Sequence, residues 1–295
     1  PLNILFFNTF IKNKISKIAN DCDLILAQNN IPDSIVAYLI SKKIKKPYIL
    51  NARGDFNLKI LSLPYLKKIY ANSSQLITHS PQNFKKIKQK TDIQLIPHPI
   101  EDLFFSNNTT KEATTPIKLI SVCRLLELKH LDWVIRALAQ LKNKKYQFIY
   151  NIFGDGPELE KLKNLTHELE LENEILFHGY KDHNEINKHL QNSQIFIMPS
   201  YPETLGRSFL EAAAANCLII GHENTGVDGL LKHKESAIFV NRKNIDRELE
   251  YVFKNFSSNF LTTYLQNARN IVDELTWKNI GYRYYKLYKK ITTNG

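Results

Sequence analysis

The sequence contains only three cysteines, an odd number, and they lie far apart at Cys22, Cys123 and Cys217. This usage argues against a disulfide framework or a cysteine-based zinc site, and it favours a reducing compartment. Long hydrophobic runs are also missing. The longest, such as 195–198 and 217–221, fall far short of the roughly 20 apolar residues that span a bilayer. We therefore do not expect an integral membrane protein.

The chain is nevertheless long and apolar enough to form a sizeable core. Its 295 residues are 43% hydrophobic and 23% charged, which is typical of a globular protein rather than a disordered one. A chain of this length exceeds one ordinary domain, so two domains are expected.

Positive charge is concentrated in the first third of the chain. The net charge is +11. Residues 1–100 hold 15 Lys and Arg against 5 Asp and Glu, whereas residues 101–295 hold 25 against 24. Such asymmetry indicates that one domain faces an anionic partner: nucleic acid, a membrane surface or an anionic substrate. A compositional bias towards lysine would explain the count, although it explains the one-sidedness less well.

Short apolar runs alternate with helix-like segments along almost the whole chain. This alternation predicts parallel sheets with helices on both faces. The expected strands are 23–28, 47–51, 75–79, 93–97, 117–123, 147–153, 174–178, 194–199, 218–221 and 237–240. The expected helices are 31–44, 62–72, 81–89, 128–141, 158–171, 183–191, 207–215 and 244–255, with an amphipathic tail over 277–291.

Residues 101–116 are rich in Asn, Thr and Ser and have no apolar period, which is typical of a linker. We expect an N-terminal Rossmann-like domain over 1–100, a C-terminal one over 117–275, and a final helix in 276–295. Two doubly wound domains joined this way face a cleft, and ligands of such sheets bind at the carboxyl ends of the strands. The first domain is short and the chain opens with a proline rather than Met, so we expect its N-terminal portion to be missing.

The most specific signal is the segment from Ser200 to Glu211, in which a strand ends, a loop follows and a helix begins near Gly206. Glu203 lies on the loop and Glu211 more than one turn into the helix. The backbone N–H groups between them are expected to be unpaired helix-start donors, which bind anions. These donors belong to Thr204, Leu205, Gly206 and Arg207. A nucleotide diphosphate would suit this geometry, with Glu211 on the ribose and Glu203 facing a sugar. The alternative is a helix-start charge at Glu203 and a surface residue at Glu211.

Two further loops carry candidate residues. Arg124 and Lys129 follow the strand 117–123 and could both point at one diphosphate, or else be two solvated charges. Gly154 opens a Gly-Asp-Gly-Pro turn after the next strand. Neither a P-loop nor a dinucleotide fingerprint is present, so this turn alone is a weak signal.

Together these motifs resemble the retaining glycosyltransferases of family 4, also called glycosyl transferases group 1, which have the GT-B fold. The segments that carry the resemblance are Ile120-Ser-Val-Cys-Arg-Leu with Lys129, Gly154-Asp-Gly-Pro-Glu158, Phe177-His-Gly-Tyr180, the Glu203 to Glu211 spacing, Ile96-Pro-His-Pro-Ile100 and the Trp277–Ile291 tail. The resemblance covers nearly the whole chain. It implies that Glu203, Arg124 and Lys129 act in catalysis, and that Glu211, the 204–207 backbone, Gly154 and Tyr180 bind the donor. It implies no metal and no cofactor.

Some residues depart from the family pattern. Ala52-Arg53-Gly54 stands where the family often has a His-Gly pair that meets the donor sugar, so Arg53 is a candidate contact to donor or acceptor. Thr204 replaces the usual Gly after the first Glu, and His130 replaces the usual Gly after the Lys.

The resemblance implies transfer of a sugar, with retained configuration, from a UDP- or GDP-linked donor to a glycan or lipid-linked acceptor. Hexosyl transfer (EC 2.4) in cell-surface polysaccharide or lipopolysaccharide synthesis is the expected role. A nucleotide-sugar epimerase or hydrolase on the same fold is the alternative. A basic nucleic-acid-binding protein is a further alternative, suggested by charge alone, since no binding motif is recognisable and we expect no nucleic-acid partner.

Three lysine-rich segments with interleaved apolar residues, 11–18, 41–46 and 84–90, fit an anionic membrane surface. We therefore expect a cytoplasmic protein, peripheral at the cytoplasmic face of the inner membrane. The alternative is that these lysines are ordinary solvated helix faces.

Overall fold

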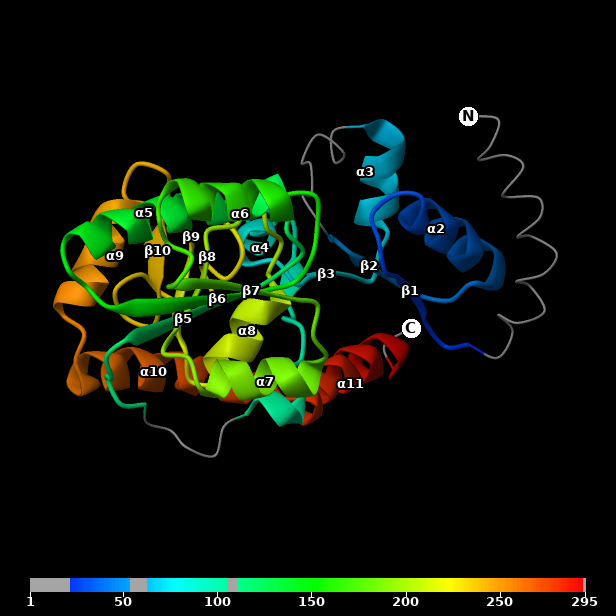
Figure 1. Ribbon diagram of the computed structural model, residues 1–295. Coiled ribbons are helices and arrows are strands. Elements are labelled where there is room, and N and C mark those ends of the chain that lie inside the picture. The colour runs from blue at the N-terminus through cyan, green and yellow to red at the C-terminus, as the bar shows by residue number, and fades with distance from the viewer. Residues whose placement is uncertain (1–21, 54–62, 106–110, 294–295) are drawn as a thin grey trace. The chain divides into compact units, whose positions relative to one another are not determined.

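The computed structural model describes residues 22–53, 63–105 and 111–293, coloured in Figure 1. The chain divides into two compact units, one of residues 1–97 and 278–295, the other of residues 98–277. Each unit has its own parallel sheet. None of the described helices is long and apolar enough to cross a membrane.

The first unit has a four-stranded parallel sheet in the order β1-β2-β3-β4. Every residue of its two central strands is buried, as expected where both faces of a parallel sheet are covered. The strands are β1 (Ile25–Ala27), β2 (Tyr48–Asn51), β3 (Gln75–Thr78) and β4 (Ile93–Leu95). The helices are α2 (Asp33–Ile44), α3 (Pro64–Ala71), α4 (Pro81–Lys88) and α11 (Trp277–Thr293), whose residues from 278 onwards belong to this unit.

The second unit has a six-stranded parallel sheet in the order β10-β9-β8-β5-β6-β7. In Figure 1, α5 and α6 cover one face of this sheet, and α7 and α8 lie on the other. The strands are β5 (Ile117–Val122), β6 (Phe148–Phe153), β7 (Ile175–Gly179), β8 (Ile195–Met198), β9 (Leu218–His222) and β10 (Ile238–Val240). The helices are α5 (Leu131–Asn143), α6 (Leu159–Glu168), α7 (His183–Gln191), α8 (Arg207–Ala214), α9 (Ile245–Lys254) and α10 (Ser258–Val272).

The order of strands creates a switch point between β5 and β8. These two strands pair in parallel register, Leu119 with Ile195 and Ile120 with Phe196. Connections from β5 lead away towards β6, whereas those from β8 lead towards β9. At such a point the loops at the carboxyl ends of the two strands diverge and leave a crevice in which ligands bind.

Two local expectations from the sequence need correction. The helix after β5 begins at Leu131, because a short 3-10 turn, Glu127–Lys129, intervenes and His130 adopts the left-handed conformation (φ 51°). The helix α10 was not expected at all, although Ser257 caps it by accepting a hydrogen bond from the Phe260 N–H.

The segment 101–116, expected as a linker, packs on the second unit in its described part. Phe104, in a 3-10 turn that lies against α7 and α8, is fully buried. Lys111 donates to the carbonyl oxygen atoms of Leu190 and Ser193 at the end of α7. The described part of this segment is therefore packed on the second unit.

The Gly154 turn lies against the loop that follows β5. A Cβ atom built on Gly154 would stand 1.8 Å from the carbonyl oxygen of Cys123, and the residue has φ of 120°. The Leu125 N–H donates to the Asp155 carbonyl at 2.9 Å, and the Gly154 N–H donates to that of Gly179 at 2.8 Å. Gly154, which has no side chain, therefore allows the segments that follow β5, β6 and β7 to pack against one another.

Replacing Gly154 with Ala should destabilise the second unit by about 2–4 kcal/mol, because both the contact and the backbone conformation exclude a side chain. Gly179→Ala is the matched control. It also has a positive φ, 67°, but has no atom within 4 Å of a built Cβ. The control should lose only about 1–2 kcal/mol of backbone strain. Urea unfolding followed by circular dichroism measures both, and equal losses would contradict the role given to the Cys123 contact.

Candidate active site

The candidate residues of the second unit follow neighbouring strands. Arg124 and Lys129 come after β5, Gly154 after β6, and Glu203 after β8. Parallel strands end at one edge of the sheet, so these loops share that edge. Residues of motifs that are far apart in the sequence therefore lie on neighbouring loops.

Lys129 and Glu203 form the central contact of this edge. The Lys129 ammonium lies 2.7 Å from Glu203 Oε2, and the two side chains are only 15% and 16% exposed. Ser200 donates to the same carboxylate oxygen at 3.1 Å, and the Thr204 N–H donates to Oε1 at 3.1 Å. Both carboxylate oxygens are thus engaged, and the ion pair joins the β5 and β8 loops directly.

The backbone of Glu203 is held from the β9 side. The Thr225 hydroxyl accepts a hydrogen bond from the Glu203 N–H and donates to the Glu203 carbonyl, both at 2.7 Å. The Gly226 N–H donates to the same carbonyl at 2.9 Å. Sequence reasoning did not find Thr225, because 22 residues separate it from Glu203 and it belongs to no motif.

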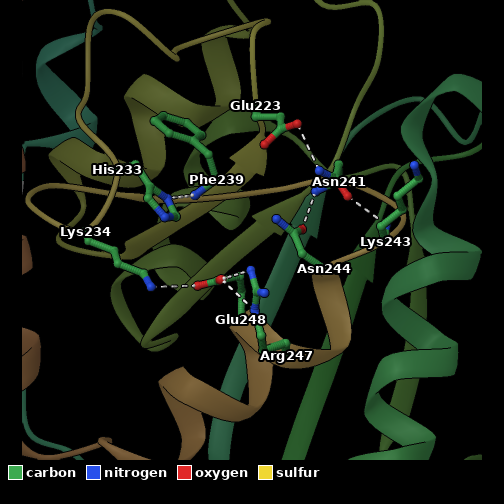
Figure 2. A network of polar contacts seen from close by, with 9 residues as sticks. All are labelled: Glu223, His233, Lys234, Phe239, Asn241, Lys243, Asn244, Arg247 and Glu248. Carbon is green, nitrogen blue, oxygen red and sulfur yellow. Dashed lines mark hydrogen bonds and ion pairs between the residues drawn. The ribbon is translucent and has the colours of Figure 1, made fainter.

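A polar network anchors the segment that carries Thr225 (Figure 2). Asn241, just after β10, donates from Nδ2 to Glu223 Oε1 at 2.9 Å, and its N–H donates to Asn244 Oδ1 at 2.6 Å. On the same side, the buried Glu248 carboxylate is paired with Arg247 at 2.9 Å and with Lys234 at 3.4 Å. These contacts fix both ends of the β9–β10 connection.

Helix α8 begins with backbone donors. Gly206 has φ of 72°, and a Cβ there would lie 2.5 Å from the Phe209 ring. Over the part of the chain that the structure describes, the N–H groups of Leu205, Gly206 and Arg207 meet no acceptor. Thr204 differs from the expectation, because its N–H is already bonded to Glu203. Three free donors at a helix start remain able to bind an anion.

Glu211 lies within α8, and its side chain is only 12% exposed. Burial raises its pKa, and the Arg207 guanidinium, 3.8 Å away, lowers it in part. Arg207 also lies 3.3 Å from Glu101, and Glu101 accepts from His183 at 3.2 Å. Glu101 was not singled out in the sequence, since it lay in the supposed linker. The Glu211 carboxylate, held near Arg207, can accept hydrogen bonds from hydroxyl groups of a ligand.

Arg124 and Tyr180 are both exposed, and Tyr180 keeps 81% of its surface accessible. Over the described residues the Arg124 guanidinium has no ion-pair partner. Both side chains are therefore accessible to a ligand at the strand ends.

Arg53 belongs to the first unit, where it follows β2. Its N–H donates to Asn30 Oδ1 at 3.2 Å, and its carbonyl accepts from Asn30 Nδ2 at 2.6 Å. Its guanidinium contributes to lowering the pKa of His79, an effect that burial dominates. His79 contacts Asn51 Nδ2 at 2.8 Å and the Ile96 carbonyl at 2.6 Å. Arg53 therefore lies near the buried His79 at the carboxyl ends of β2 and β3.

No group of three or more His, Cys, Asp or Glu side chains within the described ranges could hold a metal ion. The chemistry available at this edge is that of cations and backbone donors around an anion.

The pKa of Glu211 gives a test of its burial. A carboxyl whose pKa is raised on folding ionises more readily in the unfolded chain, so its cost to stability is absent below the unfolded pKa, grows as the pH rises from there, and is complete above the folded pKa. Replacing Glu211 with Gln should therefore raise the melting temperature of the unliganded protein at pH 7. The gain should vanish near pH 4, below the ordinary Glu pKa of about 4.3. Glu223→Gln serves as the control, and a gain that is the same at both pH values would contradict the argument.

Comparisons with known proteins identify relatives of this chain. The sequence profile described as "Glycosyl transferases group 1" matches residues 104–268. Protein CapJ of Staphylococcus aureus is 26% identical over 234 residues, which cover 72% of this chain and 58% of CapJ. The amylovoran biosynthesis glycosyltransferase AmsK of Erwinia amylovora is 31% identical over 127 residues, 41% of this chain and 31% of AmsK. The chain spans 48% of the Escherichia coli (strain K12) relative WcaL, and thus about half the length of such curated relatives.

Solved structures share the fold. A glycosyltransferase from Rickettsia africae ESF-5 matches with a TM-score of 0.80 and 20% identity, covering 100% of this chain and 83% of its own. Anabaena Alr3699/HepE, solved in complex with UDP, matches with a TM-score of 0.79 and 17% identity, covering 94% of this chain and 81% of its own. The family profile covers more than half of the chain and includes both the Lys129 and the Glu203 loops, so the protein belongs to the glycosyl transferases group 1 family.

Proposed function

We propose that the protein is a retaining glycosyltransferase of the hexosyl-transferring type (EC 2.4). It would transfer a sugar from a nucleotide-diphosphate sugar to a glycan or lipid-linked acceptor. The observation that carries the proposal is the Lys129–Glu203 pair beside the free N–H groups of Leu205, Gly206 and Arg207. Cations and a helix start at one strand edge form an anion site of the kind a diphosphate needs.

In this proposal Lys129, Arg124 and the α8 donors contact the diphosphate. The bond between the sugar carbon and the diphosphate oxygen breaks, the acceptor hydroxyl oxygen bonds to that carbon, and the hydroxyl proton passes to the departing diphosphate oxygen. Negative charge grows on the departing diphosphate, and preorganised donors that stabilise it supply the largest contribution to rate. Glu203 fixes the Lys129 ammonium, while Glu211 accepts the ribose hydroxyls and the Gly154 turn supports the Arg124 loop. Tyr180 lies beside the base, and Arg53 contacts donor or acceptor.

The donor class follows from similar proteins. Anabaena Alr3699/HepE has been solved with UDP and with UDP-glucose, so a UDP-sugar is the first donor to test and a GDP-sugar the second. AmsK acts in amylovoran biosynthesis, as its name states, which supports a role in cell-surface polysaccharide or lipopolysaccharide synthesis. We propose that the protein works in the cytoplasm, at the inner face of the membrane, where its basic first unit meets an anionic surface.

A thermal-shift screen against UDP-, GDP- and ADP-glucose tests the donor. A ligand that binds only the folded state raises the melting temperature in proportion to the logarithm of its concentration above Kd. We expect a shift with UDP-glucose that Glu211→Gln reduces. If no nucleotide sugar gives a shift, or if free sugar is released at the full rate without acceptor, the transferase proposal is wrong.

Removing either diphosphate cation should slow transfer strongly. Arg124→Ala and Lys129→Ala should each lower kcat/KM by roughly 100-fold, as expected for a charged transition-state contact. Lys161→Ala is the control, because Lys161 is an exposed cation paired with Glu158 on the surface. Donor turnover measured by UDP release checks all three, and full activity in both cleft variants would refute the diphosphate role.

The two glutamates should give different kinetic defects. Glu211→Gln weakens a hydrogen-bond acceptor for ribose that is used in both ground and transition states, so KM for the donor should rise with kcat little changed. Glu203→Gln frees Lys129 from its fixed position, so kcat should fall by roughly 10–100-fold. Steady-state kinetics with varied donor separates these outcomes. Indistinguishable defects would mean that the two roles are wrongly divided.

A further inference from the structure

A groove lined by basic side chains lies between β4 and α11, within the first unit. Its volume is 280 Å³. The helix lines it with cations, and the strand side contributes mainly apolar groups. The lining residues are Gln94, Leu95, Ile96, Arg283, Lys286, Leu287 and Lys290. None of these residues belongs to the candidate site of the second unit.

The three cations lie on one side of the helix by virtue of their spacing. Arg283, Lys286 and Lys290 are three and four residues apart, which brings their side chains together on an α-helix. α11 carries two more lysines, Lys278 and Lys289, and its sequence contains no Asp or Glu. Over the described residues none of the five forms an ion pair, so no described acid neutralises their charge.

Aromatic rings border the cations. Tyr282 and Tyr285 are 56% and 57% exposed, and their rings stack with centroids 6.4 Å apart. The Lys286 ammonium lies 4.5 Å from the Tyr282 centroid and the Lys289 ammonium 6.0 Å from that of Tyr285. Exposed amphipathic rings beside lysines are characteristic of surfaces at a membrane–water interface.

The first unit as a whole is strongly basic, which also favours an anionic partner. Its described residues contain sixteen Lys and Arg against three Asp. Two of the lysine segments expected to meet a membrane, 41–46 and 84–90, are described, whereas 11–18 lies outside the described residues. Within the described two, Lys46 pairs with Asp23 at 3.4 Å, and Lys42 and Lys88 lie over the rings of Tyr38 and Phe84. Three cations of α11, by contrast, line a groove that neither of these two segments borders.

We propose that the α11 groove docks the protein on an anionic phospholipid surface, with a lipid phosphate between Arg283, Lys286 and Lys290. A phosphate matches three converging cations, while the apolar wall formed by Leu95, Ile96 and Leu287 suits the glycerol and upper acyl carbons beside it. Tyr282 and Tyr285 rest at the headgroup level. A nucleic acid would offer the phosphate with a polar ribose, which the apolar wall does not match. This proposal rests on the membrane part of the proposed function.

Vesicle co-sedimentation tests the docking surface. The full chain should bind vesicles of phosphatidylglycerol mixed with phosphatidylcholine, and not vesicles of phosphatidylcholine alone. Binding should weaken as salt rises, since the screening length is only about 8 Å at 0.15 M. The triple variant Arg283→Gln, Lys286→Gln, Lys290→Gln should bind roughly 100-fold more weakly, because each basic residue near an anionic surface contributes about 1 kcal/mol.

A matched triple variant distinguishes the effect of the groove residues from the effect of the protein's total positive charge. Lys145→Gln, Lys188→Gln and Lys243→Gln remove the same charge from exposed lysines of the second unit, and should weaken binding by less than about fivefold. Tyr282→Ser with Tyr285→Ser keeps every charge, yet should weaken binding by roughly tenfold, since interfacial rings contribute independently of charge. Equal losses in the two lysine–arginine variants, or unchanged binding in the groove variant, would overturn the proposal.

Two further measurements would reveal a different ligand in the groove. If inorganic phosphate raises the melting temperature in a groove-dependent way while vesicles do not bind, the groove holds a free phosphate and the docking proposal is wrong. A groove-dependent gel shift with single-stranded RNA and no vesicle binding would replace the lipid by a nucleic acid. UDP-glucose binding is measured on each variant. If the unaltered chain binds UDP-glucose but does not bind anionic vesicles, the docking surface alone is wrong, whereas absent UDP-glucose binding in the unaltered chain contradicts the transferase proposal.

Discussion

The ion pair between Lys129 and Glu203 is the contact on which the candidate site depends. It joins the loops that follow β5 and β8, two strands that are adjacent in the sheet but 74 residues apart at the pair itself. Both side chains are mostly buried, so losing either partner would leave a charge with little solvent to compensate it. A diphosphate arriving at this edge would meet an ammonium already placed, with little conformational entropy left to lose.

Further contacts within the second unit hold that ion pair in place. Thr225 and Gly226 hold the backbone of Glu203 from the β9 side, and the network around Asn241 and Glu223 fixes the segment that carries them. On the other side, the Gly154 turn packs its backbone on the Arg124 loop, which only a residue without a side chain allows. The sheet thus provides rigid supports, while the chemistry lies on the loops between them.

The two units differ strongly in net charge. The second unit has 20 Lys and Arg against 24 Asp and Glu, yet it places cations at one edge of its sheet, next to free backbone donors. The first unit has 20 Lys and Arg against 5 Asp and Glu, and α11 contributes five of those cations and no acid. A localised anion site and a diffuse basic surface suit two kinds of ligand. The first fits one diphosphate group, and the second fits a surface that presents many anions.

The sequence by itself determined the alternation of strands and helices, and hence the parallel sheets, because buried parallel strands are continuous apolar runs that differ clearly from amphipathic helices. It also placed Arg124, Lys129, Glu203 and Glu211 at strand ends and helix starts. Only the tertiary structure decided that Lys129 meets Glu203, that Thr225 holds Glu203, and that the Thr204 donor is already used. These contacts join residues far apart in the chain, and the order of strands, which no local pattern encodes, brings them together.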